Sequence, residues 1–395
     1  MLTRLPIVLL FSIAVLPHID IGNKFIYLDD LPVVFILGLL VVAVFNINDL
    51  NLSKTYEIKY LYLWITLLIY TLFNPLIVLG YFSITTDFLR YVFLFSLLFI
   101  LFYLEDSNAV ISKMSIALLV FLSLFSILSY LFKINLGTDA YDYWNIGFNS
   151  NNWGFTPGRI NGLQAGGPNS FGDLICILTL KVISDKKIDN ILYNLLIALG
   201  YLACFFTYSR SSIIVLVLFS TILLIYKNRR TSILVLLLSI LLTMNFGFID
   251  RFISESETDG INDRVEMQSA TAGAIQERPL KNSFFGYGFN QFAIVRSEIK
   301  PIDQFSDNLR PTGPHNGYMF QLLNYGYIGL LLFLSTLLYP ITQISSFKLK
   351  DLMDTLNIFP IAAFLVLNLA GDVFQNQSIA WIFWIYLFDL YKENS

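Results

Sequence analysis

The sequence predicts an all-α polytopic membrane protein. Of its 395 residues, 56% are hydrophobic and only 13% are charged, and apolar runs long enough to cross a bilayer recur from end to end. We expect a single transmembrane domain, residues 1–395, of about twelve transmembrane helices. A helix-length window places them near residues 5–20, 31–46, 60–80, 87–104, 114–132, 169–184, 190–208, 211–226, 232–248, 316–340, 356–371 and 376–391.

The first of these helices is expected to be retained. Arg4 precedes an apolar stretch, as in a secretory signal, but "LPHIDIG" offers no small-residue cleavage site and further spans follow at once.

The short loops assign an orientation. "NLSKTYEIK", "EDSNAVISK", "SDKKIDN", "YKNRRT", "SSFKLKDLMD" and the tail "YKENS" all carry Lys or Arg, which favours a cytoplasmic position for them and for both termini. Two longer segments, residues 133–168 and 248–314, then become loops on the outer side. No repeat or linker indicates a second domain.

Charge and cysteine content exclude several classes. A formal net charge of -3 does not favour a nucleic-acid partner. Cys176 and Cys204 both lie in apolar runs, so we interpret them as packing residues rather than as a disulfide or a metal site.

Arginine is concentrated on the predicted outer side, whereas the inner loops carry mostly lysine. The planar guanidinium suits bidentate binding of phosphate, which predicts an anionic ligand outside; contacts with lipid headgroups or loop carboxylates are the alternative for any one arginine. These outer arginines are Arg90, Arg159, Arg210, Arg251, Arg264, Arg278, Arg296 and Arg310.

Two short stretches place arginine beside polar residues at helix ends. In "RINGLQAGGPNSFG", Arg159 precedes a Gly- and Pro-rich turn and Asn169, which we expect to cap the helix that follows. In "TYSRSSIIVLV", Ser209 and Ser211 flank Arg210 on a tight turn; an ionisable group there is a functional candidate, and an interfacial anchor is the alternative.

The loop at residues 248–314 contains a third stretch. Residues 263–276 fit a short amphipathic helix at the interface that begins from an Asn or Asp cap. "FFGYGF" follows as a flexible turn. Its Gly-x-Gly is weak evidence for phosphate binding, although it lies between Arg264 and His315 on the same side.

His315, one of two histidines, opens the apolar run "PHNGYMFQLLNYGYIGLLLFL". A side chain that titrates near neutral pH at the outer start of a membrane helix is a candidate general base, with a capping or surface histidine as the alternative. His18, near a loop, is interpreted as an interfacial polar residue.

Taken in order, the Arg/Gly/Pro-Asn turn, the Ser-Arg turn, the "R…ERP…GYG" segment and "HNGYMFQLLNYGYIGL" resemble the O-antigen polymerase and ligase superfamily. These are bacterial membrane glycosyltransferases of the GT-C type, including the Wzy-type polymerases. The resemblance covers residues 150–340 best. It implies a GT-C-type architecture in the inner membrane, with a large periplasmic loop that carries short amphipathic helices and a site that faces the periplasm.

The resemblance also implies a reaction. Such enzymes transfer a glycan from undecaprenyl pyrophosphate to an acceptor sugar hydroxyl, with inversion and without a metal or other cofactor. His315 would be the base, and Arg210 and Arg264, assisted by Arg159 or Arg278, would bind the pyrophosphate. The residues with supporting roles would be Asn316, Asn169, Ser209, Ser211 and Glu277. Glu277 would be the alternative base if His315 does not have this role.

Three functions follow in order of preference. The first is a polymerase that joins lipid-linked repeat units, favoured by the compact chain, the moderate outer loop and the aromatic content. The second is a ligase that transfers polymer to the lipid A core. The third is a polysaccharide or lipid transporter, disfavoured because the spans are nearly free of charge at their centres, with Lys181 and Asp389 near inner ends. Expected partners are lipid-linked oligosaccharide donor and acceptor and membrane lipid, not nucleic acid; a chain-length regulator protein is left open.

Overall fold

The computed structural model describes most of the chain from residue 55 onward. The described residues are 11–12, 15–16, 55–103, 107–136, 146–149, 158–163, 167–185, 190–227, 233, 235, 237, 239–242, 260–288, 314–344, 357–371 and 373–394. The spans predicted near residues 5–20, 31–46 and 232–248 lie largely or wholly outside these ranges. The total of twelve spans therefore stays a prediction.

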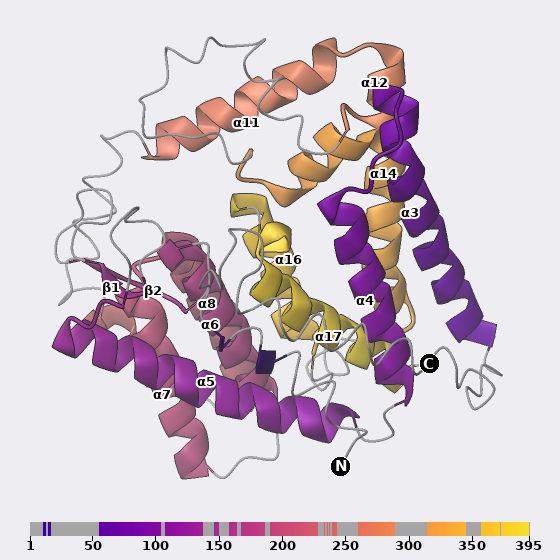
Figure 1. Ribbon diagram of the computed structural model, residues 1–395. Helices are drawn as coiled ribbons and strands as arrows, with labels where there is room; N and C mark the ends of the chain where they lie inside the picture. The colour runs from indigo at the N-terminus through magenta and orange to yellow at the C-terminus, as the bar shows by residue number, and fades with distance from the viewer. Residues whose placement is uncertain are drawn as a thin grey trace.

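Each of the other nine predicted spans is a helix in the described part of the chain, with ends close to those expected (Figure 1). The helices are α3 (Thr55–Leu79), α4 (Thr86–Tyr103), α5 (Ser107–Phe132), α6 (Gly167–Ser184), α7 (Asn190–Phe206), α8 (Arg210–Lys227), α14 (Gly317–Thr342), α16 (Ile358–Ala370) and α17 (Gln377–Asn394). The short 3-10 helix η7 (Val373–Gln375) joins the last two.

Within the described ranges, three helices are long and apolar enough to cross a bilayer. They are Lys59–Leu79 of α3, Asn108–Phe132 of α5 and Gly317–Thr342 of α14. Shorter apolar helices run over Ile191–Phe206, Arg210–Tyr226 and Ile358–Ala370. Large apolar side chains such as Leu131 and Leu331 are exposed on the long helices, as expected of surfaces that meet lipid. These features describe a helical membrane protein.

The helices form two groups with α16 between them (Figure 1). One group contains α5, α6, α7 and α8, and α6 is its most enclosed member, with nearly every described side chain buried. The other contains α3, α4, α14 and α17. Since α16 packs against α6 and α8 on one side and against α14 and α17 on the other, it joins the two groups.

Aromatic side chains fill the second group. The rings of Trp64 and Trp384 lie 5.0 Å apart edge to face, and those of Phe364 and Phe383 stack at 3.9 Å. Lipid tails are as apolar as these side chains, so the hydrophobic effect does not drive membrane helices together. Close packing of aromatic rings stabilises their association instead.

A chain of buried polar side chains links α6, the residue that precedes α16, and α17. Lys181 Nζ of α6 donates to Asn357 Oδ1 at 2.6 Å, and Asn357 Nδ2 donates to Asp389 Oδ2 of α17 at 2.9 Å. All three residues are at most 1% exposed. The sequence predicted Lys181 and Asp389 near inner helix ends, and the structure adds that an asparagine links them.

The predicted outer loops contain short elements of their own. In residues 133–168, β1 (Gly147–Asn149) pairs antiparallel with β2 (Arg159–Asn161), so the all-α prediction needs this small correction. In residues 248–314, the predicted helix is present as α11 (Gly260–Glu277). It begins at Gly260 rather than at Asn262 or Asp263, and α12 (Leu280–Phe285) follows it.

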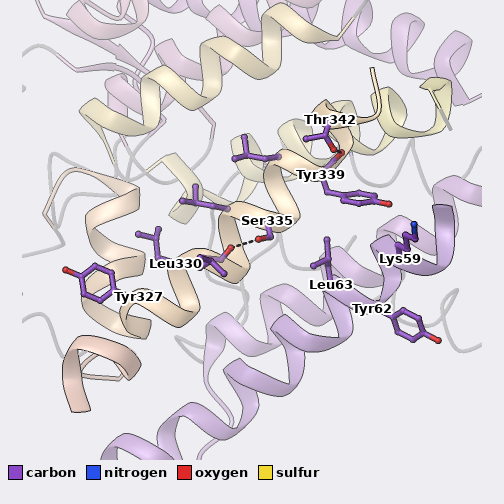
Figure 2. Close-up of a pocket in the computed structure, with 11 residues that line it drawn as sticks. Lys59, Tyr62, Leu63, Tyr327, Leu330, Ser335, Tyr339 and Thr342 are labelled. Carbon is purple, nitrogen blue, oxygen red and sulfur yellow. Dashed lines mark hydrogen bonds between the residues drawn. The ribbon is translucent and has the colours of Figure 1, made fainter. Parts of the chain in front are cut away.

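Helix α14 is not the single straight span that the sequence predicted. Gly326 has φ 66° and ψ -168°, which breaks the helix into residues 317–325 and 327–342. Figure 1 shows the helix changing direction beside α12. The second part lies along α3, and the two helices enclose a groove of about 860 Å³ (Figure 2). Its lining is mostly apolar, with Leu63 opposite Leu330 and Leu334, and it contains none of the predicted site residues.

Candidate functional site

Arg159 joins the β-hairpin to the start of α6 and to the turn that follows α7. Its Nε donates to the Thr207 carbonyl at 2.8 Å, and its Nη2 donates to Asn169 Oδ1 at 2.7 Å. The side chain is only 5% exposed. Asn169 lies inside α6, which starts at Gly167, so the expected capping role is replaced by this contact with Arg159.

The turn between α7 and α8 is strained and tightly packed. Tyr208 has φ 51°, a left-handed conformation that is rare for a bulky residue. Its buried hydroxyl lies 3.3 Å from the hydroxyl of Tyr130. Such strain persists only where the surroundings impose it, and it is common at functional sites. Arg210 follows this turn as the first residue of α8. Arg210 and Ser211 are both half-buried.

Ser209 belongs to a buried polar cluster that the sequence analysis missed. Its Oγ lies 2.6 Å from Ser212 Oγ, and Ser212 donates to Asp173 Oδ1 at 2.5 Å. A β-carbon on Gly172 would lie 2.8 Å from the side chains of Thr207, Ser209 and Ser212, so α6 must approach the turn closely. The sequence feature that could have indicated this cluster is the carboxylate of Asp173 within a mostly apolar span.

His315 lies in a turn that immediately precedes α14. Its φ is 50°, again left-handed, and its side chain is half-buried. Gln268 Nε2 of α11 donates to the His315 carbonyl at 3.4 Å. The helix cap is the next residue: Asn316 Oδ1 accepts from the amides of Tyr318 and Met319, both at 3.1 Å. The capping alternative therefore belongs to Asn316.

The start of α14 is fixed against α16 as well. The Gly317 amide donates to the Gly371 carbonyl at 3.2 Å. A β-carbon on Gly317 would lie 2.2 Å from Asn368 Oδ1, which explains the glycine directly after the cap. Because α16 also packs against α6 and α8, it contacts both the helix that follows His315 and the helix that contains Asn169, the partner of Arg159.

Arg278 and Glu277 lie where α11 ends. The Arg278 side chain is 6% exposed, and it donates through Nη1 to the Leu322 carbonyl at 3.0 Å and through Nη2 to the Ser283 carbonyl at 3.3 Å. Burial lowers the pKa of its guanidinium, but the ordinary value is so high that the group stays charged at neutral pH. Glu277 is exposed.

The Gly-x-Gly of "FFGYGF" has a different partner from the phosphate suggested by the sequence. The amide of Tyr287 donates to the Leu323 carbonyl at 2.9 Å, and the amide of Gly288 donates to the Asn324 carbonyl at 3.0 Å. These backbone donors are used within the protein, so the motif docks the loop on α14.

Arg90 is a further residue near the start of α14 that the sequence did not single out for the site. Its Nη1 lies 2.9 Å from Asp87 Oδ1, and Asp87 Oδ2 accepts from the hydroxyl of Tyr325 at 3.1 Å. A cavity of about 20 Å³, room for one water, adjoins Arg90 and Gly317.

The remaining arginines of the predicted outer loops lie mostly outside the described residues. Arg264 lies within α11, but its side chain is outside the described residues, as are Arg251, Arg296 and Arg310. The site therefore consists of two described parts: Arg159, Asn169 and the 207–212 turn in one, and His315 with Asn316, Gln268 and Arg278 in the other. Among the described residues, no three His, Cys, Asp or Glu side chains are grouped as metal ligands.

One family model matches part of the chain. The family model described as O-antigen ligase matches residues 195–334, which include the α7–α8 turn, all of α11 and the start of α14. A search of curated proteins finds no match. The matched segment carries the Ser-Arg turn and the His315 motif on which the resemblance in the sequence was based, so the match supports the O-antigen polymerase and ligase superfamily, whose members are glycosyl-transfer enzymes.

Proposed function

We propose that this protein is an O-antigen polymerase of the bacterial inner membrane. It joins undecaprenyl-pyrophosphate-linked repeat units on the periplasmic side, in a GT-C-type architecture. The observation that carries the proposal is the placement of His315: the matched family segment contains a half-buried histidine in a strained turn, whose carbonyl is bound by α11 and which is followed by the cap of a membrane helix.

His315 acts as the general base in this proposal. The acceptor sugar hydroxyl gives its proton to an imidazole nitrogen, and the hydroxyl oxygen attacks the anomeric carbon of the donor from the face opposite the leaving group. The bond between that carbon and the pyrophosphate oxygen breaks, which inverts the configuration. A half-buried position suits this role, because part of the residue stays accessible to a sugar.

Arginine side chains stabilise the leaving lipid pyrophosphate. Arg210, half-buried at the start of α8, and Arg264 of α11 bind it directly, since charge develops there as the bond breaks. Arg159 assists by holding the outer end of α6 and the 207–210 turn in place through Asn169 and Thr207.

The ligase is the second candidate, favoured by the description of the matched family as O-antigen ligase. Both enzymes use the same donor chemistry and differ in the acceptor. Our preference for the polymerase rests on the compact chain and the moderate length of the outer loops.

The lipopolysaccharide of a deletion strain separates these functions. Loss of a polymerase should leave a core that carries a single repeat unit. Loss of a ligase should instead leave bare core, with lipid-linked polymer accumulating in the inner membrane. An unchanged ladder of chain lengths would contradict both assignments.

A further inference from the structure

The break in α14 separates the residues after His315 from the part of the helix that follows α3. Residues 317–325 precede the break and residues 327–342 follow it. The direction of the first part, and therefore the position of His315, is not set by a continuous helix. Contacts at the break have to set it.

A break in a helix leaves carbonyls without their regular partners, and at membrane depth such carbonyls need other donors. Here four consecutive carbonyls next to Gly326 accept hydrogen bonds from outside the helix. For residues 322 to 325 in order, the donors are Arg278 Nη1 at 3.0 Å, Tyr287 N at 2.9 Å, Gly288 N at 3.0 Å and Tyr70 Oη at 2.5 Å.

Arg278 is the only charged donor of these four, and it binds both of the helices that meet at the break, α14 and α12. While Nη1 binds the carbonyl of Leu322 in α14, Nη2 binds the carbonyl of Ser283 in α12. Its Cζ also lies 5.1 Å from the ring centroid of Tyr327, the first residue after the break. One planar guanidinium thus joins the loop to both parts of the helix, a geometry that an ammonium cannot reproduce.

We propose that Arg278 is a positioning residue for the transfer reaction: it fixes the first part of α14, and with it His315, by binding the broken backbone. The inference rests on the proposed role of His315 as the base. It differs from direct binding of pyrophosphate, because Arg278 is only 6% exposed and both terminal nitrogens of its guanidinium donate to carbonyls of the protein.

The test compares Arg278→Met with Arg278→Lys and with Lys281→Met, which removes an exposed cation from neighbouring α12. Hydrogen exchange, followed by mass spectrometry, measures the opening of residues 317–326 in the full-length protein. Arg278→Met should speed exchange there, Arg278→Lys less so, and Lys281→Met should leave it unchanged.

Kinetics on synthetic lipid-linked repeat units provide the second readout. Arg278→Met should lower kcat by up to about a hundredfold, the loss caused by a small misplacement of a catalytic group, while binding of undecaprenyl pyrophosphate is kept. In a variant that already carries Gly326→Ala, Arg278→Met should lower kcat little further, because both substitutions disturb the same contact between α12 and the break in α14.

Two results would overturn the inference. One is loss of undecaprenyl pyrophosphate binding by Arg278→Met with exchange unchanged, which would make Arg278 a direct ligand. The other is full activity of Arg278→Met while His315→Gln is inactive. Should Arg278→Met fail to accumulate, the same outcomes apply to Arg278→Lys. Full activity of His315→Gln would instead remove the proposed base, whatever Arg278 does.

Discussion

Gly326 and Gly286 meet backbone to backbone where α12 ends against α14. A β-carbon on Gly326 would lie 2.3 Å from the Phe284 carbonyl oxygen, and one on Gly286 would lie 2.2 Å from the Asn324 carbonyl oxygen. Both residues also have positive φ, 66° and 79°. Neither position has room for a side chain, so the loop and the helix break can approach only as glycine allows.

Gly326→Ala and Gly286→Ala should each destabilise the protein. Their ψ angles of -168° and -169° place both in a region of backbone conformation that is essentially restricted to glycine and costs about 1 to 3 kcal/mol for a residue with a β-carbon. Displacement of the opposing backbone adds to this cost. We expect a lower midpoint of thermal unfolding in detergent. Gly273→Ala is the control, since it lies in α11 with nothing within 4 Å of the added atom. Equal midpoints for all three variants would show that the contact does not form.

Lys181→Met should destabilise the protein strongly because it leaves Asp389 and Asn357 buried with an interrupted polar chain. Removing one partner of a buried charged pair costs about 3–5 kcal/mol. The double variant Lys181→Met with Asp389→Leu should recover much of this loss. Urea or thermal unfolding of the three proteins measures the recovery, and a double variant weaker than the single one would disprove coupling between the two side chains.

Arg210→Ala and Arg264→Ala should abolish polymer while protein level and membrane insertion stay normal. The Lys variants should restore only part of the activity, because a point charge replaces a bidentate fork. Lipopolysaccharide profiles and immunoblots of complemented strains provide the measurement. Full activity in both Lys variants would mean that charge alone is needed, and full activity in both Ala variants would remove these residues from the site.

His315→Ala should lose nearly all transfer and still bind lipid-linked donor. A general base contributes about a hundred- to ten-thousandfold to the rate, and His315→Gln, which hydrogen-bonds but accepts no proton at neutral pH, should be almost as slow. Activity of the wild-type enzyme should also fall as acid protonates the imidazole. Assays with purified enzyme, in the presence of chelator, test this. Near-normal turnover by the Gln variant would reduce His315 to positioning and direct attention to Glu277.

Reporter fusions at Asn228 and Asn290 should report opposite sides of the membrane. The prediction comes from the Lys- and Arg-bearing short loops, and both residues lie outside those that the structure describes. The same side for both fusions would mean that the number of spans between them is wrong, and that Arg210 and His315 do not share a face.

Hydropathy was sufficient to predict the helices but not the break in α14. The run "YGYIGLLLFL" is apolar throughout, and glycine is frequent in membrane helices, so Gly326 gave no distinctive local signal. The break depends on donors supplied by Arg278, Tyr287 and Gly288, which no local pattern connects with residues 322–324. The three-residue strands of the β-hairpin were likewise too short to leave a period in the sequence.

The sequence indicated which residues were candidates for the site, because of their residue types, but it did not indicate their hydrogen-bond partners. Arg159 and Asn169 were selected from one stretch, yet Asn169 was expected to cap a helix and instead accepts from Arg159. Asp173 was overlooked because one carboxylate in an apolar run has no periodicity, and only the packing of α6 against the turn shows its bond with Ser212.

The part of α14 after the break is short for a bilayer. Residues 327–342 extend about 24 Å at 1.5 Å per residue, less than the roughly 30 Å of a typical hydrocarbon core. A short apolar helix is accommodated by local thinning of the membrane. Lipid headgroups next to α14 should therefore lie closer to the bilayer midplane than elsewhere. A sugar carried on such a lipid would then be displaced along the membrane normal beside this helix, which changes its distance from the imidazole of His315.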